Sequence, residues 1–176
     1  MLFENPSIEI NELPSTEALD FKKLDPRYLT VKIVNHTIFF SFSGLGLVLF
    51  AWLRDGFPFN PVYLILLGAW VVIYLITLWY MIKAFQFKGY VLRERDIIYR
   101  KGWLWSSTTI VPFNRIQHCE LSQGPFEKTY NLAKLNIFTA GGQSSDLRLP
   151  GLKKEEAARI KEFLVNQIND HNKPRS

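Results

Sequence analysis

The stretch "VYLILLGAWVVIYLITLWYMI", residues 62–82, carries no charged side chain along its whole length. A helix rises about 1.5 Å per residue, so this stretch would span roughly 30 Å, the thickness of the hydrocarbon core of a bilayer. Helices buried in a soluble core rarely remain uncharged over so many residues. The sequence therefore predicts a transmembrane helix at residues 62–82.

A second uncharged run, "IVNHTIFFSFSGLGLVLFAWL", lies upstream at residues 33–53. It is more polar than the first run, but it is also long enough to cross a bilayer. The connector at residues 54–61 is too short for a domain, so we expect a transmembrane hairpin with both chain ends on one side. Gly44, Gly46 and Gly68 are expected to let the two helices approach closely.

Basic side chains gather on the side of the hairpin that holds the chain ends. They are Lys22, Lys23, Arg27, Lys32, Lys83, Lys88, Arg93, Arg95, Arg100 and Lys101. The connector holds only Arg54, which adjoins Asp55. Because cytoplasmic flanks of membrane spans carry an excess of Lys and Arg, both termini are predicted to be cytoplasmic.

The formal net charge of +5 is concentrated after the hairpin, where residues 83–176 carry sixteen basic and nine acidic side chains. An anionic leaflet attracts such a segment by about 1 kcal/mol for each nearby Lys or Arg. Nucleic acid is a rival explanation, but no recognised nucleic-acid motif accompanies the charge. We therefore expect an integral membrane protein with anionic lipid as a candidate ligand and no nucleic-acid partner.

The chain after the hairpin changes from a helical to an alternating hydrophobic pattern, and turn residues recur every eight to twelve positions, which indicates short antiparallel strands. The expected strands are residues 85–93, 96–101, 103–112, 115–122, 133–140 and 146–149. A final helix is expected at residues 153–169. Its apolar stripe consists of Ala157, Ile160, Leu164 and Ile168.

These patterns predict a membrane-anchored α+β fold. The transmembrane hairpin precedes a small antiparallel β-barrel or orthogonal sandwich, and the C-terminal amphipathic helix closes one open end. The expected parts are a cytoplasmic N-terminal segment at 1–32, the hairpin at 33–82, a cytoplasmic domain at 83–170 and a tail at 171–176.

Reactive side chains stand together at His118, Cys119 and Glu120. Side chains alternate between the two faces of a strand, so Ile116, His118 and Glu120 are expected on one face and Cys119 on the other. Cys119 is then a small buried hydrophobe, and one cysteine provides no disulfide framework. His118 and Glu120 lack a third metal ligand at a suitable spacing. We predict no catalytic residue, no cofactor and no metal, and therefore no enzyme.

His36 lies within the first predicted span, where ionisable groups are costly and often functional. Two interpretations are open. The imidazole reaches to the headgroups at the interface, or it packs against the second helix as a pH-sensitive element.

The chain resembles the bacterial pleckstrin-homology-like (PH-like) membrane proteins of the bPH2 type, an uncharacterised family, over about residues 20–170. The resemblance rests on the blocks "VPFNRIQ" (111–117), "QGP" (123–125), "TAGG" (139–142) and "LPGL" (149–152), which follow a membrane hairpin. It implies a PH-like barrel in a bacterial cytoplasmic (inner) membrane. The residues that it marks as structural are Pro112, Arg115, Gln117, Gln123, Gly124, Pro125, Asn131, Gly141, Pro150 and Gly151.

Two positions depart from the usual residues of the family. Cys119 replaces an aliphatic residue, and Asn131 replaces glycine. Asn is the residue that best substitutes for glycine at a left-handed backbone position, so the turn at Asn131 is expected to persist. We also expect Arg115, Gln117 and Gln123 to satisfy backbone groups at a bulge near Pro112.

The first functional hypothesis is a non-enzymatic protein-binding or scaffolding module at the leaflet surface. Relatives with repeated domains imply a homo-oligomer or a sister PH-like membrane protein as the partner. The alternative is binding of an anionic lipid headgroup through the first strand reversal, although an ordinary solvated turn there is also open. The contact residues would be Arg93, Arg95, Arg100 and Lys101.

Overall fold

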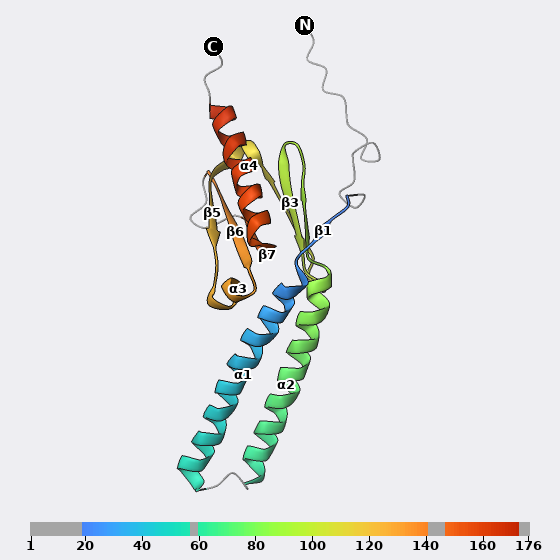
Figure 1. Ribbon diagram of the computed structural model, residues 1–176. Helices are drawn as coiled ribbons and strands as arrows, with labels where there is room; N and C mark the ends of the chain where they lie inside the picture. Colours follow the sequence, from blue (N-terminus) through green and yellow to red (C-terminus); the bar gives the residue numbers. More distant parts are fainter. Residues whose placement is uncertain (1–18, 57–59, 141–146, 173–176) are drawn as a thin grey trace.

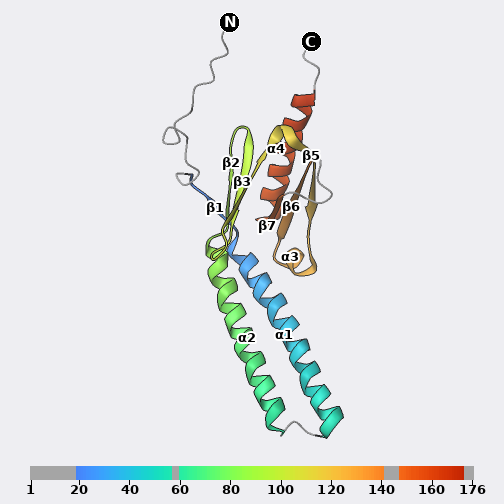
Figure 2. The ribbon, with the colours of Figure 1, turned by 180° about the vertical axis from the view of Figure 1, so that it is seen from behind.

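The structure is a computed structural model that describes residues 19–56, 60–140 and 147–172. Two long helices, α1 (Pro26–Asp55) and α2 (Pro61–Gln86), run side by side and carry the β-rich domain at one end (Figures 1 and 2). Both are long and apolar enough to cross a membrane. The predicted hairpin is confirmed, and each helix is longer than the apolar run within it.

Each helix begins at a side chain that accepts a backbone hydrogen bond. Asp25 accepts from the N–H of Arg27 at 2.9 Å, and Asn60 accepts from the N–H of Val62 at 3.0 Å. A proline follows each cap at the first helical position, where a missing N–H costs nothing. These signals explain why α1 starts seven residues and α2 one residue before the apolar run.

Contact between the two helices is polar and aromatic near the domain. His36 Nε2 lies 3.1 Å from Thr77 Oγ1, and the imidazole stacks on Tyr74 at 5.3 Å between ring centroids. Further along, a Cβ added to Gly44 would stand 3.0 Å from the Trp70 ring, so this glycine permits close approach. The same expectation for Gly46 and Gly68 is wrong, because neither has an atom within 4 Å of an added Cβ.

The strands form two antiparallel sheets that are not closed into a barrel, so the sandwich alternative is the correct one. The first sheet has the order β1 (Lys22–Lys23), β2 (Gly89–Leu92), β3 (Asp96–Lys101) and β4 (Ser107–Pro112). The second has the order β5 (Ile116–Ser122), β6 (Leu132–Thr139) and β7 (Leu147–Lys153). The short helices η3 (Phe113–Arg115) and α3 (Pro125–Thr129) lie between strands.

Strand β1 was not predicted. Its two lysines lie just ahead of α1 and pair with Tyr90 and Gly89 of β2. A hydrogen bond of 3.0 Å from the Asp25 N–H to the Gly151 carbonyl then joins the entry of α1 to β7. The chain on both sides of the hairpin therefore contributes to the folded domain.

The terminal helix α4 (Lys154–Asn172) packs over the second sheet and η3. Ala157, Ile160 and Leu164 are buried and Ile168 packs against the core, which confirms the predicted apolar stripe. The core beneath it is aliphatic, with Leu135, Leu149 and other fully buried side chains.

Strand β5 departs from strict alternation. The pairing register with β6 shifts between Ile116 and His118, which marks a bulge at Gln117. Ile116 and Cys119 are both buried, whereas Gln117 and His118 are exposed. The prediction that Ile116 shares a face with His118 is therefore wrong, because the extra residue of a bulge reverses the alternation beyond it. Burial of Cys119 is confirmed.

Candidate functional site

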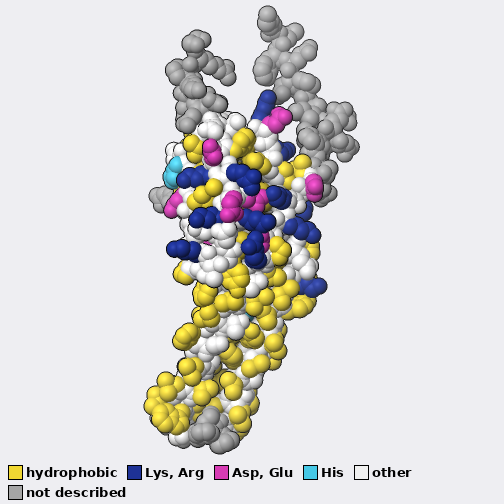
Figure 3. All heavy atoms as spheres, viewed as in Figure 1, with side chains coloured by type: hydrophobic (Ala, Val, Ile, Leu, Met, Phe, Trp, Pro, Cys, Tyr) yellow, Lys and Arg dark blue, Asp and Glu magenta, His cyan; other side chains and the backbone are white. Residues whose placement is uncertain are grey.

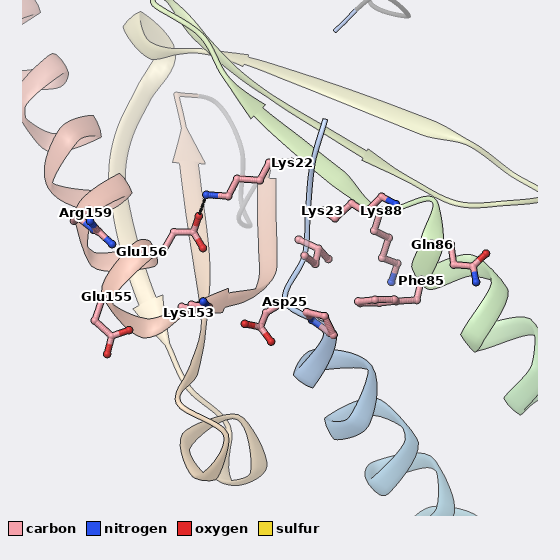
Figure 4. Close-up of a pocket in the computed structure, with 12 residues that line it drawn as sticks. Lys22, Lys23, Asp25, Phe85, Gln86, Lys88, Lys153, Glu155, Glu156 and Arg159 are labelled. Atoms are coloured by element: carbon pink, nitrogen blue, oxygen red, sulfur yellow. Dashed lines mark ion pairs between the residues drawn. The ribbon is translucent and has the colours of Figure 1, made fainter. Parts of the chain in front are cut away.

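A cleft of about 640 Å³ lies where the two membrane helices meet the domain. Strand β1 and the first residues of α1 form one side, the end of α2 forms another, and the start of α4 forms the third (Figure 4). Its lining residues are Lys22, Lys23, Leu24, Asp25, Pro26, Phe85, Gln86, Lys88, Lys153, Glu155, Glu156 and Arg159. We call it the junction cleft. Five basic and three acidic side chains give it a net positive charge.

The acidic side chains of the junction cleft are engaged by neighbours. Asp25 accepts from the Arg27 guanidinium at 3.1 Å, and this contact lowers the pKa of the carboxyl. Glu156 forms an ion pair with Lys22 and accepts a hydrogen bond of 2.7 Å from the Tyr90 hydroxyl. Burial opposes ionisation of Glu156, but the two hydrogen bonds outweigh it and lower its pKa. These carboxylates are therefore held as anions.

The remaining basic side chains of the junction cleft are not neutralised in this way. Within the described residues, no carboxylate forms an ion pair with Lys23, Lys88, Lys153 or Arg159. Figure 3 shows Lys and Arg side chains gathered over the part of the domain that adjoins the apolar helices. The cleft therefore has cationic groups to offer to an anionic ligand.

Lys88 is the most perturbed of these groups. Burial, reinforced by the charges of Lys32 and Lys101, lowers its pKa from the ordinary 10.5 to about 8. Lys32 comes from α1, and its ammonium also lies 5.8 Å from the Tyr28 ring centroid. Pairing of Gly89 with the residue before Lys101 places Lys88 and Lys101 at the same end of the β2–β3 hairpin. Three elements thus bring three ammonium groups together, and we call this set the lysine cluster.

The four basic residues predicted as a lipid contact do not form one surface. Arg93 and Arg95 lie at the β2–β3 reversal, which points away from the membrane helices (Figure 1). Arg93 is also paired with Asp96. Arg100 and Lys101 lie at the opposite end of β3, and the Arg100 guanidinium stacks on the Phe21 ring at 4.1 Å.

The residues of the "VPFNRIQ" block shape the corner between the two sheets. Pro112 ends β4, and η3 follows it. The Arg115 carbonyl accepts a hydrogen bond of 3.1 Å from the Ala140 N–H, and Gln117 is the bulged residue of β5. The block therefore turns the chain from one sheet to the other.

The "QGP" block organises the turn around α3. Gln123 donates through Nε2 to the Leu132 carbonyl at 2.6 Å. The N–H of Gly124 donates to Glu127 Oε2 at 2.8 Å, and Pro125 is the first residue of α3. Gln123 thus satisfies a backbone group, as predicted, although at this turn and not near the bulge.

The last motif residues fasten α4 and α1 to the sheet. Asn131 has a φ of 55°, so the predicted left-handed conformation is confirmed, and its Nδ2 donates to Glu155 Oε1 at 3.0 Å. Gly151 also has a positive φ, 67°, and a Cβ there would stand 2.5 Å from Cγ of Tyr28. The two remaining motif residues are Pro150, in β7, and Gly141, which lies outside the described residues.

The reactive side chains of β5 do not form a site. Burial raises the pKa of Cys119 to about 11, which suppresses the thiolate. His118 lies on the outer face and stacks on Phe138, with ring centroids 4.2 Å apart. Across residues 19–56, 60–140 and 147–172, no group of three or more His, Cys, Asp or Glu side chains is placed to hold a metal ion.

Sequence reasoning missed the junction cleft because its basic groups come from distant parts of the chain. Lys22, Lys23 and Lys88 served only to orient the hairpin, and Lys153 and Arg159 lie within the helix predicted at residues 153–169. The number of Lys and Arg residues next to both predicted spans was the one feature of the sequence that could have indicated the cleft. The pairing of β1 with β2 and the hydrogen bond between Asp25 and Gly151 bring them together.

Comparisons with known proteins agree with this architecture. A family model described as "Bacterial PH domain" matches residues 37–168, more than half of the chain. The UPF0699 transmembrane protein YdbS of Bacillus subtilis (strain 168) is 39% identical over 75 residues, which cover 43% of this chain and 45% of that protein. The match thus spans less than half the length of that relative. No solved structure matches the chain. Neither description names a reaction, and the description of the relative is that of a transmembrane protein.

Proposed function

The chain belongs to the bacterial PH domain family, and from that premise we propose that it is a membrane-anchored, non-enzymatic module that binds an anionic lipid headgroup in the junction cleft. The ligand is the phosphate of a headgroup that carries no compensating cation, such as phosphatidylglycerol, in the leaflet nearest the domain. The proposal is supported by the position of the cleft at the domain-side ends of α1 and α2, both of which are long and apolar enough to cross a membrane.

The lysine cluster carries this proposal: Lys88 lines the junction cleft, and Lys32 and Lys101 lie near Lys88 but outside the lining of the cleft. Lys32, Lys88 and Lys101 converge although no carboxylate of the described residues pairs with any of them. Cations held together without a counter-charge destabilise a fold, and a phosphate oxygen relieves their repulsion through charge-assisted hydrogen bonds. Each basic group near an anionic surface contributes about 1 kcal/mol.

The proposal moves the lipid contact from the first strand reversal to the other end of the same hairpin. Arg93 and Arg95 lie at the end away from the membrane helices, so they are poorly placed to reach the leaflet that holds those helices (Figure 2). Of the four basic residues predicted as the lipid contact, Lys101 belongs to the new site, and Lys32 and Lys88 are added to it.

Thermal unfolding of the full chain in lipid nanodiscs tests this function. Phosphatidylglycerol in place of phosphatidylcholine is expected to raise the melting temperature of the wild type, and Lys88→Gln is expected to remove most of that gain. Arg95→Gln is the matched control, since it removes one exposed charge at the far end of the hairpin and should keep the gain. Equal lipid-dependent gains in both variants would exclude the proposed site.

A protein partner is the second candidate function, and the open edge of the first sheet favours it. Strand β4 pairs only with β3 in the described sheet, and none of its side chains, "STTIVP", is charged. Natural proteins usually protect such an edge with charged residues, because unpaired backbone groups recruit further strands. A second copy of the chain or a sister PH-like membrane protein would add a strand there.

Crosslinking in intact membranes tests the edge. Wild-type chain is expected to give a crosslinked dimer or a hetero-complex, and Ile110→Lys is expected to reduce it, because Ile110 is an exposed residue of β4. Recovery of the monomer alone from the wild type would refute this second function.

We further propose that the domain lies on the cytoplasmic face of a bacterial inner membrane. Support comes from the basic residues on the domain side of the hairpin and from the single Arg54 on the other side. A green fluorescent protein fused to the C-terminus should fluoresce, since it does not mature when exported through the membrane unfolded. Dark fusions that are present at normal levels would reverse the orientation.

A further inference from the structure

The connection between β3 and β4 carries three consecutive apolar residues, Trp103, Leu104 and Trp105. The sequence pattern predicts a strand over residues 103–112, but β4 begins only at Ser107, so these three residues form the tip of a hairpin. The tip lies beside the domain end of α2 (Figure 2). We call these three residues the aromatic tip.

Contacts with α2 determine how far the aromatic tip reaches along the helix. The Trp103 ring packs edge-on against Trp79, with centroids 5.3 Å apart, and lies 6.3 Å from the Tyr80 ring. Trp79 precedes the last residue of α2, Gln86, by seven positions, or about 10 Å along the helix axis. The tip therefore lies alongside the apolar part of α2 and not beyond its end.

The outer part of the tip is exposed to an unusual degree. Leu104 is 63% exposed and Trp105 is 84% exposed, as much as the side chains that cover the membrane helices, such as Ile65 at 71%. Burying a Leu or Trp side chain is worth about 2 kcal/mol or more, so a folded domain gains nothing by holding both in water. Their position requires an apolar environment around the tip.

We propose that the aromatic tip inserts into the interfacial region of the leaflet that surrounds the domain end of α2. Trp is enriched at this depth of a bilayer, because its ring is apolar and its indole N–H still reaches a polar partner. Lys101 stands two residues before Trp103, at the level of the headgroups. Insertion would add a third contact with the membrane to those of the two helices and so help to fix the height and tilt of the domain.

A second copy of the chain is a less suitable partner for the aromatic tip than lipid is. Stable protein interfaces bury about 800 Å² on each partner and involve some twenty residues, whereas the tip offers three. Its apolar surface is instead continuous with the lipid-facing surface of α2 through Trp79 and Tyr80. Lipid already covers that surface.

Fluorescence of the full chain in vesicles tests the insertion. A variant with only Trp105, in which Trp52, Trp70, Trp79 and Trp103 are replaced by Phe, is reconstituted in phosphatidylcholine with bromine atoms on the acyl chains. The inserted tip predicts emission at short wavelength, strong quenching by bromines close to the headgroup, and little quenching by aqueous iodide. Emission typical of water with quenching by iodide would overturn the proposal, as would a shielded emission that bromine does not quench.

A second pair of variants covers the case in which four Phe substitutions prevent folding. In a Cys119→Ala background, Leu104→Cys carries an environment-sensitive dye at the tip, and Glu94→Cys carries it at the far reversal as the matched control. Only the dye at Leu104→Cys should report an apolar surrounding that bromolipids quench. Equal, water-like signals from both positions would contradict insertion.

Discussion

The backbone N–H of Asp25 donates to the carbonyl oxygen of Gly151 at 3.0 Å, and this bond fastens the entry of the first membrane helix to the last strand of the domain. The chain separates the two residues by the whole hairpin and most of the domain. This bond joins the hairpin to the domain at one side of the junction cleft, which Asp25 lines.

Gly151→Ala is expected to destabilise this connection. The residue has a φ of 67°, which costs a side chain about 1–2 kcal/mol, and the added Cβ would collide with Tyr28. We expect a loss of about 2 kcal/mol or more in the free energy of unfolding, measured by denaturation in mild detergent. Gly46→Ala is the control, because its Cβ meets nothing within 4 Å, and it should be neutral or slightly stabilising. An equal loss in both would disprove the special role of Gly151.

Asn131 supports the start of α4 through its left-handed backbone and its bond to Glu155. Asn131→Gly keeps the backbone conformation but loses the hydrogen bond, and should lower the free energy of unfolding by about 1 kcal/mol at most. Asn131→Val forces a β-branched residue into the same conformation and should cost about 2 kcal/mol. Chemical denaturation of the wild type and the two variants measures their free energies of unfolding, which should decrease in the order wild type, glycine variant, valine variant. A valine variant as stable as the glycine variant would contradict the left-handed turn.

The lowered pKa of Lys88 predicts a contribution to stability that rises with pH. The folded-state pKa of about 8 lies below the ordinary 10.5, so between these values this lysine binds more protons in the unfolded chain than in the folded chain. Its contribution to the free energy of unfolding therefore increases through this window in zwitterionic detergent. The raised pKa of Cys119 acts in the opposite direction, so the contribution of Lys88 is measured as the difference between the wild type and Lys88→Met. Lys88→Met should be more stable than the wild type at pH 7, and this difference should shrink above pH 8.

Two controls accompany the pH measurement. Lys23→Met removes an exposed charge from the same cleft, and its difference in stability from the wild type should stay constant above pH 8. Added phosphatidylglycerol should reduce the difference between the wild type and Lys88→Met at pH 7, since a bound phosphate favours the charged lysine. A difference between the wild type and Lys88→Met that does not change between pH 8 and 10.5 would show that the pKa of Lys88 is not lowered.

His36 and Thr77 are expected to couple the two membrane helices. Thr77 Oγ1 lies 2.8 Å from the Ile73 carbonyl, to which it donates, so His36 Nε2–H is the donor toward Thr77. Polar contacts of this kind inside membranes contribute about 0.6 kcal/mol on average. A double-mutant cycle with His36→Ala and Thr77→Ala, read by thermal unfolding in nanodiscs, should give a coupling of that size. Additive effects would mean that the bond is not formed.

Much of the fold follows from local patterns in the sequence. The uncharged runs predict the hairpin, and the spacing of Ala157, Ile160 and Leu164 predicts the buried face of α4, because both patterns act over a few helical turns. The bulge at Gln117 was not predicted, since a single extra residue is visible only in the register with the neighbouring strand. For the same reason the short strand β1 escaped notice.

The candidate site was less predictable than the fold. Lys32, Lys88 and Lys101 come from α1, the end of α2 and β3, and no sequence spacing relates them. Arg93 and Lys101 look equivalent in the sequence, yet they lie at opposite ends of one hairpin. His36 shows the same limit: it packs against the second helix, as one of its two interpretations held, but only the fold identifies Thr77 and Tyr74 as its neighbours.

Native mass spectrometry of the full chain released from mixed-lipid nanodiscs measures the central claim most directly. With phosphatidylglycerol and phosphatidylcholine in equal amounts, the wild type is predicted to retain phosphatidylglycerol selectively. Replacement of Lys32, Lys88 and Lys101 by Gln should abolish that selectivity, whereas a variant with Arg93, Arg95 and Arg148 replaced by Gln should keep it. Equal retention of the two lipids by the wild type, or unchanged selectivity without the lysine cluster, would contradict lipid recognition at the junction cleft.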